Sequence, residues 1–177
     1  MKIEELMTRR VVACRPDTDL AHVARLMWEN DCGCVPVVDA EDRVVGIVTD
    51  RDICMGAQFQ GRPLSELRVS ACMASAVTSC RPTDSAENVA RLMGEKRVRR
   101  IPVTDAGGRL LGIVSIGDFF GAGAHKAGKE LQGAIVVGLT AIHASPARDE
   151  IVPAAPAGDR VQRKEAPRRT QKKRAKT

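Results

Sequence analysis

Aromatic residues are nearly missing from this chain of 177 residues. It contains no tyrosine, one tryptophan and three phenylalanines, although 44% of its residues are hydrophobic. A buried core must therefore be built almost entirely from aliphatic side chains. The length allows one ordinary domain, or two small repeats that share a core.

Long hydrophobic runs are also missing. No segment approaches the roughly 20 apolar residues that span a bilayer, and the first ten residues, MKIEELMTRR, carry charges where a secretory signal has an apolar block. We therefore expect a cytoplasmic protein that does not contact membranes. Its six cysteines are expected to be reduced thiols, because cytosolic reductants keep disulfides open.

Histidine is scarce, with only His22, His125 and His143. None of them has neighbours that form a Ser-His-Asp or Cys-His grouping, so we predict no catalytic residues and no enzyme. Cys32 and Cys34 are one residue apart, but no second pair follows at the spacing of a metal site. We predict no metal and no obligatory cofactor, and two interpretations of the pair remain: structural residues, or a redox-sensitive thiol pair.

Positive charge is concentrated at the C-terminal end. Residues 1–145 hold 18 Lys/Arg and 18 Asp/Glu, whereas residues 146–177 hold 10 and 4. This tail is rich in Ala, Pro and charge without apolar periodicity, which predicts disorder. It either keeps the protein in solution or binds polyanions, and without aromatic residues for stacking its contacts with nucleic acid would be non-specific.

The chain contains one unit twice. An offset of 66 residues aligns 7–52 with 73–118 at 20 identities in 46 positions, without a gap. Such repetition indicates one supersecondary unit built twice. Neither small sheet would be stable alone, so we expect the two units to pack together with pseudo-twofold symmetry.

In each unit the hydrophobic pattern changes in the order strand, helix, strand, strand, helix. For the first unit it predicts a strand at 11–14, a helix along 20–27 capped by Asp17 or Thr18, a hairpin of 35–38 and 44–48, and a helix opened by Asp50 or Asp52.

Each unit closes with the same heptad, GIVTDRD at 46–52 and GIVSIGD at 112–118. It places a hydroxyl residue, and an aspartate three residues later, where a strand meets a helix. Free amide groups and the helix dipole favour phosphate there, and the aspartate can accept from ribose hydroxyl groups. The alternative is that Thr49 and Ser115 only cap a helix.

With the methionine-led entries at Met7 and Met73, the strands VPVVD and IPVTD and the two heptads, the chain resembles a tandem cystathionine-β-synthase (CBS) domain pair, or Bateman module, over about residues 1–122. The resemblance implies an α/β (α+β) fold of two βαββα repeats packed sheet to sheet. It also implies homodimers, and two clefts that bind AMP, ADP, ATP or S-adenosylmethionine as regulatory ligands.

The resemblance assigns site residues as well. Asp52 and Asp118 match ribose ligands, Thr49 and Ser115 match the motif hydroxyl, and Arg100, with Arg99 beside it, matches a phosphate contact. Val98 and Arg100, like Cys32 and Cys34, fall where relatives line the adenine pocket. Since Gly33 and Cys34 stand in the first copy where the second has Arg99 and Arg100, we expect the second copy to be better equipped for phosphate, unless Arg51 or the other repeat supplies the first copy with a cation.

We therefore divide the chain into CBS repeat 1 (1–62), CBS repeat 2 (63–122), a helical extension (123–145) and the basic tail (146–177). The apolar residues of 126–143 recur at helical spacing, which predicts a helix that packs on the module or on its dimer partner. The predicted function is a regulatory module that senses an adenosine nucleotide and signals to a separate effector protein. The alternative is a nucleic-acid or polyanion binder that uses the tail, with the repeats as its dimerisation core.

Overall fold

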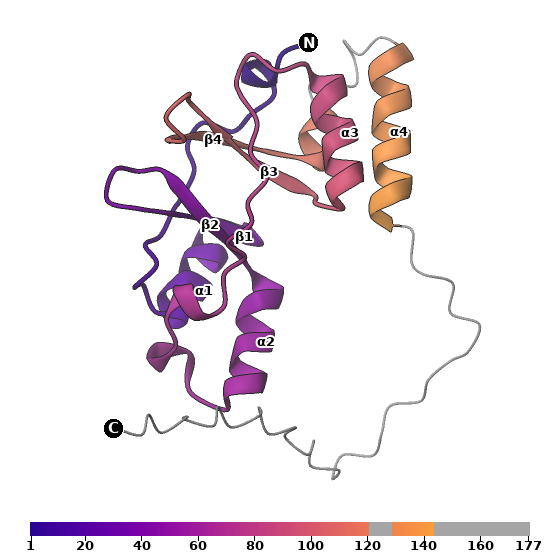
Figure 1. The fold of residues 1–177 in the computed structure, drawn as a ribbon. Helices are drawn as coiled ribbons and strands as arrows, with labels where there is room; N and C mark the ends of the chain where they lie inside the picture. The colour runs from indigo at the N-terminus through magenta and orange to yellow at the C-terminus, as the bar shows by residue number, and fades with distance from the viewer. Residues whose placement is uncertain (121–128, 144–177) are drawn as a thin grey trace, which may run out of the picture. The chain divides into compact units, whose positions relative to one another are not determined.

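The computed structural model describes residues 1–120 and 129–143. The helices are α1 (Leu20–Glu29), α2 (Asp50–Gln60), α3 (Ala86–Lys96) and α4 (Lys129–His143), and the strands are β1 (Cys34–Val38), β2 (Val44–Thr49), β3 (Arg100–Thr104) and β4 (Leu110–Ser115) (Figure 1). Four short 3-10 turns complete the order: η1 (Ile3–Glu5), η2 (Leu64–Glu66), η3 (Val69–Ala71) and η4 (Ile116–Phe119). The predicted α+β class is confirmed. The predicted tail, and the nucleic-acid contact assigned to it, lie outside the described residues.

Two antiparallel hairpins form the sheets, as predicted. β1 pairs with β2 and β3 pairs with β4 in equivalent register, with Pro36 opposite Ile47 and Pro102 opposite Ile113. The predicted strand at 11–14 is wrong except for its last residue, because only Cys14 bridges β1, in parallel at Val37. The valines before Cys14 stay partly exposed and line a cleft described below.

Two predicted helix starts need correction. Asp19, and not Asp17 or Thr18, caps α1, since its carboxylate accepts from the His22 amide at 2.8 Å. In the second repeat no α-helix begins directly after Ser115, where the chain forms the four-residue turn η4. Gly117 takes the place of Arg51 in this turn, and glycine disfavours helix.

The segments that enter the two repeats are exchanged between them. Ile3 is buried in the core of the second repeat and Thr8 pairs with Ile113, while Leu67 is buried in the core of the first repeat and Ala74 pairs with Ile47. Figure 1 shows the N-terminal segment beside β4 and α3. The boundary between the repeats at residues 62 and 63 stays a prediction. In the structure, the segment that precedes each repeat packs in the core of the other repeat.

The hairpin turns also meet. The amide of Val44 donates to the Gly108 carbonyl and that of Leu110 donates to the Asp42 carbonyl, each at 3.0 Å. These backbone bonds, together with the exchanged entry segments, hold the ends of β1 and β3 at fixed positions. Both clefts described below depend on that arrangement.

The predicted helix within 126–143 is α4, and it packs along α3. Its apolar residues Leu131, Ala134 and Ile135 are buried in the second core. The two helix backbones come close at Gly94 and Gly138, where a Cβ atom on Gly94 would lie 2.8 Å from the Gly138 Cα. None of the helices described is long and apolar enough to cross a membrane.

Two buried thiols, Cys14 in the first core and Cys80 in the second, are expected to lower the stability of the fold at alkaline pH. Burial raises the pKa of Cys14 to about 11 and that of Cys80 to about 12, above the ordinary value of 9.0. The folded chain therefore keeps protons that the unfolded chain loses above pH 9, so we expect the free energy of unfolding to fall between about pH 9 and 11, by at most ~1.4 kcal/mol per pH unit for each thiol. Urea unfolding at pH 7, 8, 9 and 10 measures this. Cys80→Ala should give a flatter alkaline fall, and an unchanged one would contradict the assignment.

Candidate ligand-binding site

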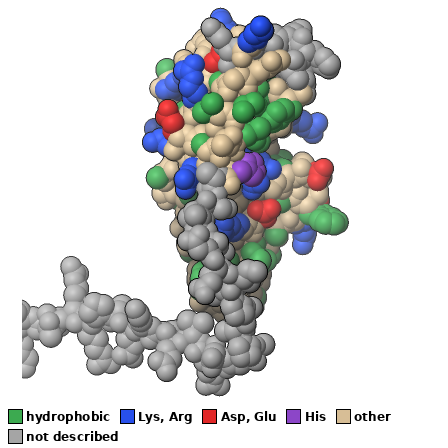
Figure 2. Space-filling model, turned by 90° about the vertical axis from the view of Figure 1, so that its right-hand side faces the viewer, with side chains coloured by type: hydrophobic (Ala, Val, Ile, Leu, Met, Phe, Trp, Pro, Cys, Tyr) green, Lys and Arg blue, Asp and Glu red, His purple; other side chains and the backbone are tan. Residues whose placement is uncertain are grey.

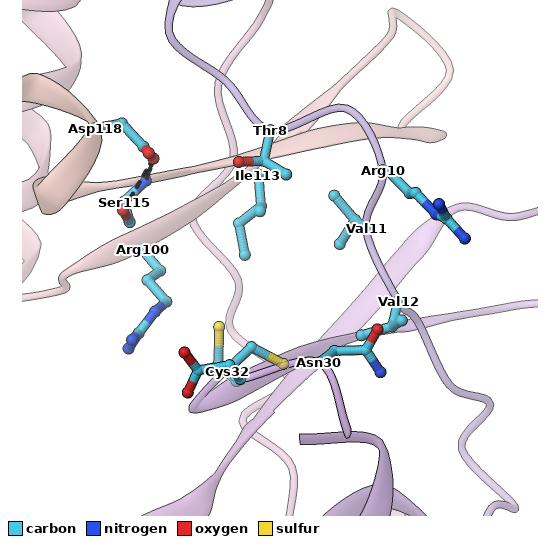
Figure 3. A pocket seen from close by; sticks show the side chains of 12 residues that line it. Thr8, Arg10, Val11, Val12, Asn30, Cys32, Arg100, Ile113, Ser115 and Asp118 are labelled. Carbon is cyan, nitrogen blue, oxygen red and sulfur yellow. Dashed lines mark hydrogen bonds between the residues drawn. The ribbon is translucent and has the colours of Figure 1, made fainter. Parts of the chain in front are cut away.

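Two clefts lie between the repeats, and we name the first cleft A. It has a volume of about 350 Å³. Its lining comes from the N-terminal entry segment, the end of α1 with the start of β1, and the second repeat: Thr8, Arg10, Val11, Val12, Asn30, Asp31, Cys32, Cys34, Arg100, Ile113, Ser115 and Asp118 (Figure 3). Its volume lies within the range of small-molecule sites.

Cleft B is the related hollow around the first heptad, with a volume of about 260 Å³. Its lining is Gly33, Cys34, Ile47, Thr49, Asp50, Arg51, Arg97, Val98, Arg99 and Arg100. The offset of 66 residues relates Ile47 to Ile113 and Thr49 to Ser115. Each cleft thus combines the heptad of one repeat with the strand entry of the other.

Both heptads form a capping box. Asp118 Oδ2 accepts from the Ser115 amide at 2.7 Å and from Ser115 Oγ at 2.9 Å. Asp52 Oδ2 accepts from the Thr49 amide at 2.9 Å and from Thr49 Oγ1 at 2.8 Å. Thr49 therefore caps α2 as the capping interpretation expects, whereas Ser115 opens only the turn η4, and in both heptads these bonds use one oxygen of the aspartate. Among the described residues nothing donates a hydrogen bond to the other oxygen, Oδ1, of either side chain.

The structure brings eight of the nine predicted site residues to these clefts. Cleft A holds Ser115 and Asp118 with Cys32, and cleft B holds Thr49 with Val98 and Arg99; Cys34 and Arg100 line both. Asp52 is not among the lining residues of cleft B. Whether any of the nine contacts a ligand stays a prediction.

The other repeat supplies the first heptad with cations, which is the exception that the sequence left open. Arg97 and Arg99 lie in cleft B with Thr49, because the start of β3 faces the heptad of the other repeat. The first heptad therefore receives its cations from the second repeat. Sequence reasoning also missed Thr8 and Arg10 in cleft A, and the methionine-led entry was the signal that could have pointed to them.

The two clefts differ in charge. Cleft B is lined by four arginines, Arg51, Arg97, Arg99 and Arg100, and by one acidic residue, Asp50. Within the described part of the chain, no carboxylate oxygen lies within 4.0 Å of any of these four guanidinium groups. An anion in cleft B would relieve their mutual repulsion. Cleft A is balanced, with two arginines and two aspartates.

Two residues at matched positions hold an unusual backbone conformation. Asp31 in cleft A has a φ of 47° and Arg97 in cleft B has a φ of 53°. Side chains other than glycine disfavour this left-handed region. Each residue follows the first helix of its repeat, so this bend places a charged side chain on the cleft wall: an acid in A and a base in B.

The thiol of Cys34 is poorly suited to redox chemistry. Burial raises its pKa to about 11, although the nearby Arg100 guanidinium acts in the opposite direction. Thiolate is the reactive form, so Cys34 is mostly inert near neutral pH. This favours the structural interpretation of the Cys32 and Cys34 pair.

Comparison with known proteins gives the family. The CBS domain family model matches residues 3–56 and 69–125. The chain belongs to the CBS domain family. The CBS domain-containing protein YhcV of Bacillus subtilis is 34% identical over 116 residues, which cover 66% of this chain and 81% of YhcV.

Solved structures of CBS proteins share the fold. The structure of a putative signal-transduction protein with CBS domains from Burkholderia ambifaria is 32% identical, with a TM-score of 0.60, and the match covers 68% of this chain and 87% of that one. CBSX2 in complex with AMP is 28% identical, with a TM-score of 0.61 and coverage of 71% and 97%. CBS pairs among these relatives include a nucleotide complex, so the family fold can hold an adenine nucleotide.

Proposed function

We propose that this CBS pair is a regulatory sensor that binds adenosine nucleotides in clefts A and B and passes its occupancy to a separate effector protein. The observation that carries the proposal is the group of four arginines in cleft B without carboxylate partners, beside a capped helix start. Arginine recognises phosphate through paired, charge-assisted hydrogen bonds. The AMP complex of CBSX2 supports the same ligand class.

Cleft B suits the ligand with more phosphate. Arg51, Arg97, Arg99 and Arg100 would surround the phosphate groups, and the first turn of α2 adds backbone amides and the positive end of its dipole. Ile47 and Val98 offer apolar surface to a base. We therefore assign ADP or ATP to cleft B, with Thr49 as a hydroxyl contact and Asp52 as the residue that fixes the turn.

Cleft A suits an adenosine ligand of low net charge. The second carboxylate oxygen of Asp118 is available to ribose hydroxyl groups, and Val11, Val12 and Ile113 offer apolar surface to adenine. Arg10 and Asp31 can pair with a tail that carries both signs of charge. AMP, adenosine and S-adenosylmethionine are the preferred candidates for this cleft, and ADP is expected to bind there more weakly than in cleft B.

We further infer a sensor rather than an enzyme. Among the described residues no histidine lines either cleft, and His22 and His143 are exposed outside both. The Cys34 thiol is mostly protonated near neutral pH. No general base or nucleophile has been assigned to either cleft.

We propose a homodimer formed through the helices. Trp28 on α1 and Phe59 on α2 are 88% and 74% exposed, and Val136 and Val137 on α4 are 62% and 63% exposed. Figure 2 shows hydrophobic side chains gathered on the surface of the side that carries α4. Large apolar residues left in water on helix faces are typical of an interface.

Calorimetric titration of the full chain with adenosine, AMP, ADP, ATP and S-adenosylmethionine tests the proposed ligand class. We expect saturable binding, with ATP and ADP tighter than AMP, and an approximately tenfold loss of ADP affinity in cleft B in Arg99→Gln. Arg91→Gln, which removes an exposed charge that lines neither cleft, should leave that value unchanged. If none of the five ligands saturates, the nucleotide function is wrong.

Removing residues 146–177 should not alter the affinities, and a loss would favour the alternative based on the tail.

A further inference from the structure

We propose that Arg100 couples the two clefts, so that an anionic ligand in one cleft weakens the binding of an anionic ligand in the other. The inference rests on the proposed function, because it concerns how the same two clefts influence each other. Arg100 lines cleft A and cleft B, and it also lines a third hollow of about 540 Å³ beside Trp28. Arg100 is thus shared by all three cavities.

The path of the side chain explains how one residue reaches both clefts. The Arg100 backbone is fixed opposite Ser115 by the β3–β4 register. Its side chain extends away from Ser115 towards Cys32 of the other repeat (Figure 3). There, Arg100 Nη2 would lie 3.7 Å from a Cβ atom placed on Gly33. This is ordinary van der Waals distance, so the guanidinium of Arg100 in the second repeat reaches the strand entry of the first repeat.

The twofold-related position carries no second cation. Cys34 is equivalent to Arg100, lines the same two clefts, and is a buried thiol. Two arginines at these positions could serve one cleft each. With a single arginine, a phosphate that draws the guanidinium into one cleft removes it from the other.

The position of the Arg100 guanidinium changes the net charge of each cleft and therefore its affinity for an anion. Without Arg100, cleft A keeps Arg10 against Asp31 and Asp118 and becomes net negative, which disfavours an anion. Cleft B without Arg100 keeps three arginines against Asp50. Linkage requires the same coupling factor in both directions, whichever ligand binds first. We expect a factor of about 5- to 20-fold, within the usual range for coupled sites.

ADP titrations of the full chain and of variants with one cleft filled measure the coupling. Val98→Trp fills cleft B and Val12→Trp fills cleft A, so each variant reports the affinity of the remaining cleft alone. In the native chain, the product of the two ADP dissociation constants should be about 5- to 20-fold larger than the product of the two isolated values. Adenosine, which lacks phosphate, should show no difference beyond about twofold. If a filled variant does not fold, the native chain alone still gives a comparison. The ratio of the first to the second dissociation constant is then measured for adenosine and for ADP.

The variant Arg100→Gln distinguishes coupling through Arg100 from direct electrostatic repulsion between two bound ligands. The proposal expects ADP binding in this variant to be weaker but independent in the two clefts. Coupling that persists in Arg100→Gln, or two independent ADP sites in the native chain, would overturn the role of Arg100 and leave the nucleotide sensor intact. If neither ADP nor adenosine saturates any form of the chain, both the sensor and the coupling are wrong.

Discussion

A chain carrying Arg51→Gln and Arg99→Gln is expected to bind ADP in cleft B about 100-fold more weakly than the native chain. Both residues line cleft B and neither lines cleft A. A hydrogen bond between a guanidinium and phosphate contributes roughly 1.5–3 kcal/mol, so two lost contacts correspond to about 3 kcal/mol, or two factors of ten. Calorimetry measures the change, and adenosine affinity should stay the same because adenosine carries no phosphate.

The matched control removes the same two charges elsewhere. Arg25 on α1 and Arg91 on α3 are equivalent in the two repeats, are exposed, and line neither cleft. The variant Arg25→Gln with Arg91→Gln should therefore bind ADP within about twofold of the native chain, since exposed charges further away are screened by salt. An equal loss in both double variants would mean that the overall field of the protein, and not contact in cleft B, attracts the nucleotide.

The sequence was sufficient where the signal is local. β-branched residues on both sides of two turn-forming segments predicted both hairpins, and the first heptad offered helix capping by Thr49 as one of two interpretations. These contacts lie within a few residues of each other along the chain. Their geometry follows from propensity and spacing, which the sequence shows directly.

The exchange between repeats could not be predicted in the same way. Because the repeats are alike, the pattern around Met7 would fit the core of either one, and only long-range contacts decide which core it joins. In the structure Thr8 pairs with Ile113 of the second repeat. For the same reason the sequence could not decide which heptad Arg99 faces, and in the structure Arg99 lines cleft B together with Thr49 of the first repeat.

The contact between α3 and α4 could not be predicted from hydrophobic spacing either. The spacing of Leu131 and Ile135 predicted a buried face for α4, but the close approach depends on two glycines far apart in sequence. A Cβ atom on Gly138 would lie 2.7 Å from the Ala90 carbonyl oxygen. This oxygen belongs to the backbone of α3 and cannot turn aside as a side chain could.

Gly138→Val is therefore expected to lower the free energy of unfolding by about 3 kcal/mol, at the upper end of the usual range for overpacking. The valine can be accommodated only if α4 moves away from α3, and that movement exposes the buried residues Leu131 and Ile135. Urea unfolding monitored by circular dichroism measures the loss. Because Arg97, a cleft B residue, caps the C-terminal end of α3, we also expect ADP affinity to fall.

Gly133→Val is the matched control on the same helix. A Cβ atom on Gly133 would meet nothing within 4 Å, and the residue is exposed. The same substitution there should leave stability within about 0.5 kcal/mol of the native value, because valine and glycine differ little in helix propensity. Equal stabilities for the two variants would contradict close backbone packing of α4 on α3. A loss at Gly138 alone would establish that the second repeat depends on this helix, whose outer face carries the exposed Val136 and Val137 proposed for the dimer.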